Sequence, residues 1–185
     1  MPKTLCFLYT ETNGLHKTNN IVSKKNLYLF ARPVAINYII GIVNNNLFTE
    51  QKNIKLICKP RCMHISDESI LYHGITNEYA LNNGIDPVEC INTFLNDIKK
   101  TDIIITHNID FHIKTIIAEA LKYNINIDFT KYILIDTINF YHTYEFINLH
   151  NLATNLKIKE ISESKLELIR DVFFKLYSKY IKSIN

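Results

Sequence analysis

The chain has 185 residues, of which 47% are apolar and 21% charged, with a formal net charge of +3 and a pI near 8.6. This composition is typical of one compact globular domain and excludes a disordered or fibrous chain. The mild positive charge is compatible with a nucleic-acid partner but does not require one. We therefore expect a single domain over residues 1–185.

The cellular setting is predicted from composition as well. The apolar runs are too short for a membrane span, which indicates an intracellular protein, cytoplasmic or nuclear, without a membrane partner. The chain is rich in Ile, Asn and Lys, poor in Arg and lacks Trp, which is typical of AT-rich coding, including that of some viruses. Cys58 and Cys62 have a spacing compatible with zinc, but no second pair with ligand spacing follows, so we expect no zinc site.

The first third of the chain predicts three antiparallel strands. They cover residues 4–11, 27–43 and 53–58, with a turn at Asn13-Gly14 and a hairpin connection at residues 44–46. Pro33 lacks the N–H that a central strand needs, so we expect a sheet edge or a bulge there.

The rest of the chain predicts helices alternating with short buried strands. The expected helices are 66–72, 86–100, 111–123, 149–156 and 164–181, and the expected strands are 102–106 and 132–136. N-caps are predicted at Ser66, Thr76, Asp86 and Ser164. This order favours an α/β fold, a mixed sheet covered by helices.

Three short motifs carry the functional signal. They read Tyr9-Thr-Glu-Thr-Asn-Gly-Leu15, His107-Asn-Ile-Asp-Phe-His112 and Ser164-Lys-Leu-Glu-Leu-Ile-Arg-Asp171. In this order they resemble the motifs of the DEDD 3′→5′ exonucleases of the histidine branch, in particular the epsilon proofreading subunits of bacterial DNA polymerase III. Residues 60–76, which end in His-Gly-Ile-Thr, and the segments 135–137 and 149–158 extend the resemblance along nearly the whole chain.

The resemblance implies a ribonuclease H-like fold, with three antiparallel strands followed by parallel strands. It also implies a site in which four carboxylates hold two divalent metals while a histidine deprotonates water. Two doubly charged ions about 4 Å apart repel by about 17 kcal/mol even at an effective dielectric constant of about 20, so the carboxylates are needed for their charge.

This chain departs from that pattern at the residues that carry the chemistry. The matching positions are Tyr9, Glu11, His112 and Asp171, and Leu166 stands where the family has its general base. Only Glu11 and Asp171 are carboxylates, and leucine cannot take a proton. We therefore expect no metal cofactor and a catalytically impaired site, with Glu11 and Asp171 as the remaining candidate metal ligands.

Several alternatives stay open at this stage. An active enzyme would use Mg²⁺ or Mn²⁺, or one transition metal on Glu11, His112 and Asp171. A substitute base would come from His16, His107, His142 or His150, whereas we expect Asp110 to point elsewhere. In simpler interpretations, Glu11 caps the strand end or meets a lysine, Asp171 lies on a solvated helix flank, and His107-Asn108 ties the loop at a strand end.

The function predicted from these observations is that of a degenerate exonuclease-like domain, kept as a nucleic-acid-binding or protein-assembly module. The expected partners are the 3′ end of single-stranded DNA or RNA, or another protein. Contacts to nucleic acid are predicted for six residues of the motifs and the loop between them, Thr12, Leu15, His73, Thr76, His107 and Asn108. A pure protein-interaction scaffold and an active metal-dependent exonuclease with a non-standard site are the alternatives.

Overall fold

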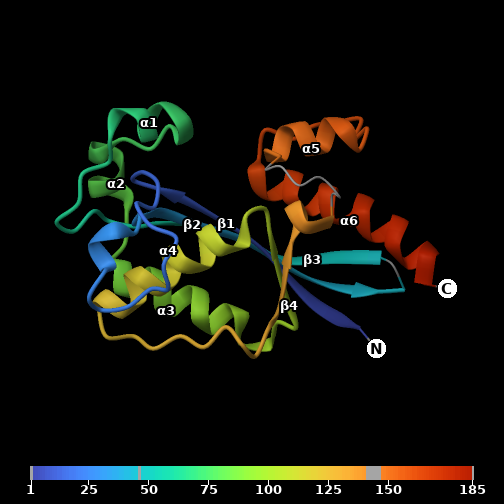
Figure 1. Cartoon of the computed structure of the whole chain (residues 1–185), viewed down its shortest axis with the longest axis horizontal. Helices are drawn as coiled ribbons and strands as arrows, with labels where there is room; N and C mark the ends of the chain where they lie inside the picture. The colour runs from blue at the N-terminus through green and yellow to red at the C-terminus, as the bar shows by residue number, and fades with distance from the viewer. Residues whose placement is uncertain (1, 46, 141–146, 185) are drawn as a thin grey trace.

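A five-stranded mixed sheet forms the centre of the molecule (Figure 1). The computed structural model describes residues 2–45, 47–140 and 147–184. In spatial order the strands are β3 (Leu47–Ile57), β2 (Pro33–Asn44), β1 (Lys3–Thr12), β4 (Ile103–Thr106) and β5 (Ile133–Asp136). The first three pair antiparallel, while β4 and β5 run parallel to β1. The predicted α/β fold with a mixed sheet is confirmed.

Helices cover both faces of this sheet. They are α1 (Asp67–His73), α2 (Asn77–Asn83), α3 (Pro87–Asp97), α4 (Ile109–Lys122), α5 (Leu149–Asn155) and α6 (Lys165–Ile184). Short 3₁₀ turns lie at Leu27–Leu29 (η1), Ile98–Lys100 (η2) and Thr137–Phe140 (η3). Within the described residues, no helix has the length and apolar character needed to cross a membrane.

The alternation of side chains along β1 divides the core into two layers. Cys6 and Leu8 point to one face, where they belong to an apolar cluster with residues of α3 and α4. Leu5 and Phe7 point to the other face and pack with α6. The ring centroids of Phe7 and Phe173 of α6 lie 5.7 Å apart. The central strands β1, β2 and β4 are thus buried on both sides, which explains their unbroken apolar runs.

The predicted helix starts are confirmed by their hydrogen bonds. Ser66 Oγ accepts from the Ser69 N–H at 3.2 Å, and Thr76 Oγ1 accepts from the Tyr79 N–H at 3.0 Å. Asp86 Oδ1 accepts from the Val88 N–H at 2.8 Å, and Ser164 Oγ from the Glu167 N–H at 3.5 Å. Each cap satisfies a backbone donor that the first helical turn leaves without a partner.

Two strand boundaries differ from the sequence prediction. The strand predicted over 27–43 begins only at Pro33, since residues 27–29 form η1. Pro33 lies in an interior strand rather than at an edge, but it occupies the first position and pairs with Thr12 across a register shift, which is the predicted bulge. The strand β3 starts at Leu47, earlier than expected, because its first half pairs with β2 and Phe48 packs against the core, although most other side chains of that half are exposed.

Candidate functional site

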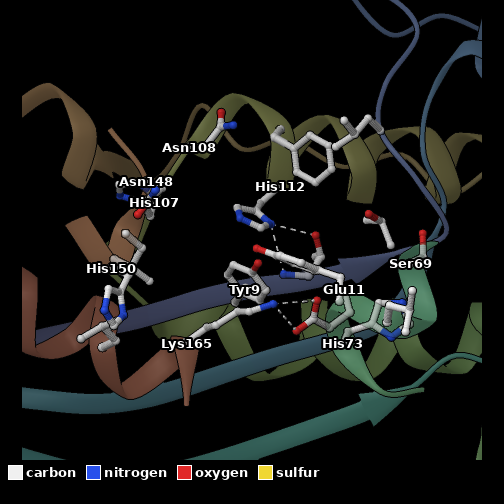
Figure 2. Close-up of a pocket in the computed structure, with 18 of the residues that line it drawn as sticks. Tyr9, Glu11, Ser69, His73, His107, Asn108, His112, Asn148, His150 and Lys165 are labelled. Carbon is white, nitrogen blue, oxygen red and sulfur yellow. Dashed lines mark hydrogen bonds and ion pairs between the residues drawn. The ribbon is translucent and has the colours of Figure 1, made fainter. Parts of the chain in front are cut away.

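A pocket of about 1200 Å³ opens where β1 ends. Its walls come from the end of β1, from α1, from the start of α4, and from the chain around α5 and the beginning of α6. All three sequence motifs contribute to it, although they are separated by about a hundred and fifty residues of chain. Figure 2 shows the side chains that converge on its floor.

Lys165 is the central cation of the pocket. Its ammonium Nζ lies 3.2 and 3.4 Å from the two carboxylate oxygens of Glu11 (Figure 2). The same Nζ lies 3.7 Å from the ring centroid of Tyr72 and 5.0 Å from that of Tyr9. A carboxylate and two aromatic rings therefore share this one positive charge. The simplest interpretation of Glu11, that it meets a lysine, is confirmed.

Tyr9 closes the space beside Glu11 with a neutral side chain. Its pKa is raised above the usual value, chiefly by burial and then by the negative charge of Glu11 and the neighbouring Tyr72 hydroxyl. The phenol therefore keeps its proton at physiological pH and offers no anionic oxygen to a cation. The centroid of its ring lies 4.7 Å from the centroid of the His112 ring.

His112 is fully inside the protein and is also neutral. Burial lowers its pKa to about 3 and outweighs the opposing hydrogen bond to the His107 backbone. Its Nδ1 accepts from the Thr10 N–H at 3.1 Å, and the Thr10 hydroxyl lies 2.8 Å from the same nitrogen. Because Nδ1 accepts, the proton lies on Nε2. The lone pair on Nδ1, which a metal would use, is therefore already engaged by Thr10.

His107 and Asn108 hold the floor of the pocket in place. His107 Nδ1 lies 2.8 Å from the Thr137 hydroxyl, and its Nε2 lies 2.8 Å from the Ile147 carbonyl oxygen. Asn108 has a left-handed backbone (φ 69°), which asparagine tolerates, and precedes α4. Asp136 accepts from the Asn108 and Ile109 N–H groups, so its carboxylate caps that helix. The predicted role of His107-Asn108 in tying the loop is confirmed.

Of the six residues predicted to contact nucleic acid, five line this pocket: Thr12, Leu15, His73, His107 and Asn108. Thr76 is not among the lining residues, because its hydroxyl is used to cap α2. Leu15 is 81% exposed at the mouth. The loop that carries it is fixed by His16, whose Nδ1 accepts from the Ala31 N–H at 3.0 Å and whose ring stacks on Phe111.

The third motif is only partly brought to the site. Asp171 is not among the residues that line the pocket, and its carboxylate accepts from Arg170 Nε at 3.0 Å on the flank of α6. It lies six positions after Lys165 in the helix, which places the two about 120° apart around the helix axis. Leu166 is buried in the apolar cluster under β1, with Tyr9 packed against that cluster.

The residues present do not fit the divalent metals that the resemblance implies. Among the residues that the structure describes, no group of three or more His, Cys, Asp or Glu side chains is arranged to hold a metal ion. This includes the combination of Glu11, His112 and Asp171. Cys6, Cys58 and Cys90 are buried free thiols and Cys62 is an exposed one, so Cys58 and Cys62 form no zinc site within the described chain.

The substitute bases considered from the sequence have different surroundings. His107 and His150 line the pocket, whereas His16 is engaged with Ala31 and with the Phe111 carbonyl oxygen. Asp110 points away as expected, since it pairs with Lys114 at 2.7 Å and does not line the pocket. His142 lies outside the described residues.

Sequence reasoning missed Lys165, although it directly precedes Leu166 in the third motif. The motif directs attention to the residues that the family uses, and a lysine has no role among carboxylate ligands. The available signal was charge, because a partly buried carboxylate at Glu11 without a metal needs another cation nearby. The rotation of α6 about its own axis decides which lysine supplies this cation. That rotation is known only from the way α6 packs against β1.

No protein-family model and no curated relative matches the sequence. Among solved structures, the chain is similar to exonuclease I in complex with the inhibitor BCBP (TM-score 0.75, 14% identity, 97% of this chain and 42% of that chain). It is also similar to E. coli exonuclease I in complex with a dA16 oligonucleotide (TM-score 0.70, 14% identity, 96% and 41%) and to an ExoI/SSB-Ct complex (TM-score 0.70, 16% identity, 96% and 41%).

These likenesses define the class of fold. The protein has the ribonuclease H-like fold that exonuclease I also has, with its mixed sheet and helices on both faces. The chain spans about two fifths of the length of the exonuclease I chains it matches.

Proposed function

We propose that this chain is a degenerate exonuclease-like domain of the DEDD histidine-branch type, catalytically impaired and retained as a metal-independent binding module. The observation that carries the proposal is the position of Lys165. Its ammonium neutralises Glu11, the carboxylate that a metal would need, and rests against Tyr9 and Tyr72. A tethered cation of the chain thus provides part of the charge compensation that metals give in the exonuclease mechanism.

The other substitutions support the same conclusion. A neutral phenol and a neutral imidazole stand at the two positions where carboxylates would complete the charge of a two-metal site. Buried Leu166 offers no proton acceptor. Two metal ions placed beside Glu11 and Lys165 would leave an excess of positive charge that Tyr9 and His112, at the motif positions, do not compensate. Phosphodiester hydrolysis by the usual route is therefore expected to be lost.

A second candidate is the binding of a single-stranded nucleic-acid 3′ end in the pocket. It is favoured by the fold, since a neighbour was solved with a dA16 oligonucleotide, and by the side chains at the mouth. Leu15 and Tyr72 are 81% and 69% exposed there and offer apolar and aromatic surface to a base. The 3′ sugar would meet His73 and the His107-Asn108 floor.

A nuclease assay tests the proposed function. Incubation of the purified protein with 5′-labelled single-stranded DNA or RNA and Mg²⁺ or Mn²⁺ is expected to leave the substrate intact, with exonuclease I as the positive control. Adding either metal is expected to shift the thermal unfolding midpoint by less than about 1 °C, because the folded state gains no ligand. A ladder of products that disappears in Glu11→Gln would overturn the proposal.

A further inference from the structure

The pocket carries more negative than positive charge. Three carboxylates line it, those of Glu11, Glu68 and Glu163, and Lys165 is the one Lys or Arg among its described lining residues. The charge of Lys165 is already shared with Glu11. Within the described chain, neither Glu68 nor Glu163 forms an ion pair with a Lys or Arg, and both are exposed. Counting Lys and Arg against Asp and Glu, the lining has a formal net charge of −2.

The mouth of the same pocket is apolar. Leu71 and Tyr72 of α1 are 89% and 69% exposed, and Leu15 is 81% exposed on the loop after β1. All three are large side chains that expose apolar surface to water, which is unfavourable. Exposed apolar side chains gathered at the rim of a pocket, rather than scattered singly, mark a surface that another molecule covers.

From this combination we propose that the pocket binds a short peptide segment of a partner protein, in which Lys or Arg lies next to a large apolar or aromatic side chain. The inference rests on the proposed function, because only a site without metals keeps its negative charge. A nucleic-acid strand is the less favoured occupant. Its phosphates need cations, and the one lining ammonium is held by Glu11.

The apolar side chain and the basic group of the peptide would contact different parts of the pocket. Leu71, Tyr72 and Leu15 would cover the apolar side chain of the peptide. Glu68, on the same helix as Leu71, and Glu163, just before α6, would attract its basic group from opposite walls. Figure 1 shows α1 and the α5–α6 region on the same side of the sheet, so both walls belong to one open surface. Opposite charge around an apolar centre is a common arrangement at protein interfaces.

Peptide selection tests this proposal. Immobilised full-length protein is screened against a phage library of random 12-residue peptides, and selected peptides are synthesised with a fluorescent label for titration. We expect the selected sequences to be enriched in an aromatic or aliphatic residue next to Lys or Arg. Affinity is expected to fall about 10-fold in Leu71→Ser and about 3-fold in the double variant Glu68→Gln/Glu163→Gln, since apolar anchors contribute more than rim charges.

Matched controls lie on the neighbouring helix α2. Leu81→Ser removes a leucine that is 46% exposed, and Glu78→Gln removes an exposed carboxylate; neither residue lines the pocket. Both variants are expected to bind the peptides as the unmodified protein does. All these positions are on the surface, so the variants are expected to fold, which circular dichroism checks.

Three outcomes would overturn the proposal. They are the absence of any selected peptide, selected peptides that lack basic residues, and equal losses in the pocket and control variants. Binding of a labelled 15-residue oligothymidylate that is weakened by Leu71→Ser would assign the pocket to nucleic acid instead. None of these results depends on cleavage, so the failure of this inference is distinguishable from a failure of the proposed function in the nuclease assay.

Discussion

Replacement of Lys165 by methionine is expected to lower the free energy of unfolding by about 2 kcal/mol. The side chain of Glu11 is only 13% exposed, and the substitution would leave its carboxylate without a cation in a partly buried site. Loss of a partner costs about 3–5 kcal/mol for a fully buried pair and less than about 1 kcal/mol for an exposed one, so an intermediate value applies here. Unfolding in denaturant measures this loss in the free energy of unfolding.

A double-mutant cycle separates the lost charge from the lost packing. Glu11→Gln combined with Lys165→Met leaves no unpaired charge, so the double variant is expected to be more stable than Lys165→Met alone. Lys3→Met is the matched control, because Lys3 pairs with Asp102 at 3.4 Å with both side chains exposed. A cost for Lys165→Met no greater than that for Lys3→Met would mean that the ion pair on Glu11 does not organise the site.

The expected stability effect bears directly on function. In a metal-dependent enzyme, the carboxylates of the site repel one another until the metals bind, and that stored charge is what the metals neutralise. In this chain, Lys165 joins α6 to β1 through Glu11 and reaches α1 through the ring of Tyr72. These contacts hold the three elements together, and they neutralise Glu11, the one carboxylate at the motif positions that lines the pocket.

The sequence predicted the fold because the signals that form it are local. Alternation along residues 4–11, the run of isoleucines at 103–105 and the caps at Ser66 and Asp86 each depend on neighbours within a few residues. The first boundary of β2 was missed since residues 27–29 have strand-like composition, while the bulge at Pro33 decides where the pairing with β1 ends.

The candidate site was less predictable, because it depends on how distant elements dock. Glu11 lines the pocket, but which cation meets it is set by the rotation of α6 against the sheet. That same rotation leaves Asp171 outside the pocket lining, where its carboxylate accepts from the adjacent Arg170. The neutral state of His112 depends on burial and on the Thr10 N–H, and neither is visible in a motif.

The second large effect concerns pH. The pKa of His112 is lowered to about 3 in the folded protein, against about 6.5 in the unfolded chain, so between these values only the unfolded state takes up the proton. Stability is therefore fully present above pH 6.5 and falls as the pH drops toward 3. Between pH 7 and pH 5 this one group is expected to remove about 2 kcal/mol of the free energy of unfolding.

His112→Gln isolates that contribution. Glutamine cannot take up a proton, yet its side-chain oxygen is able to accept from the Thr10 N–H, so the variant is expected to lose about 2 kcal/mol less than the unmodified protein between pH 7 and pH 5. The other buried histidines, such as His107 with its lowered pKa, are common to both proteins and cancel in the comparison. His150→Gln, which removes an imidazole from an exposed position, is the control for the loss of a histidine. Equal slopes for His112→Gln and the unmodified protein would show that the folded and unfolded states take up the His112 proton over the same pH range. A charged imidazolium beside Tyr9 would then have to be included in the electrostatics of the pocket at acidic pH.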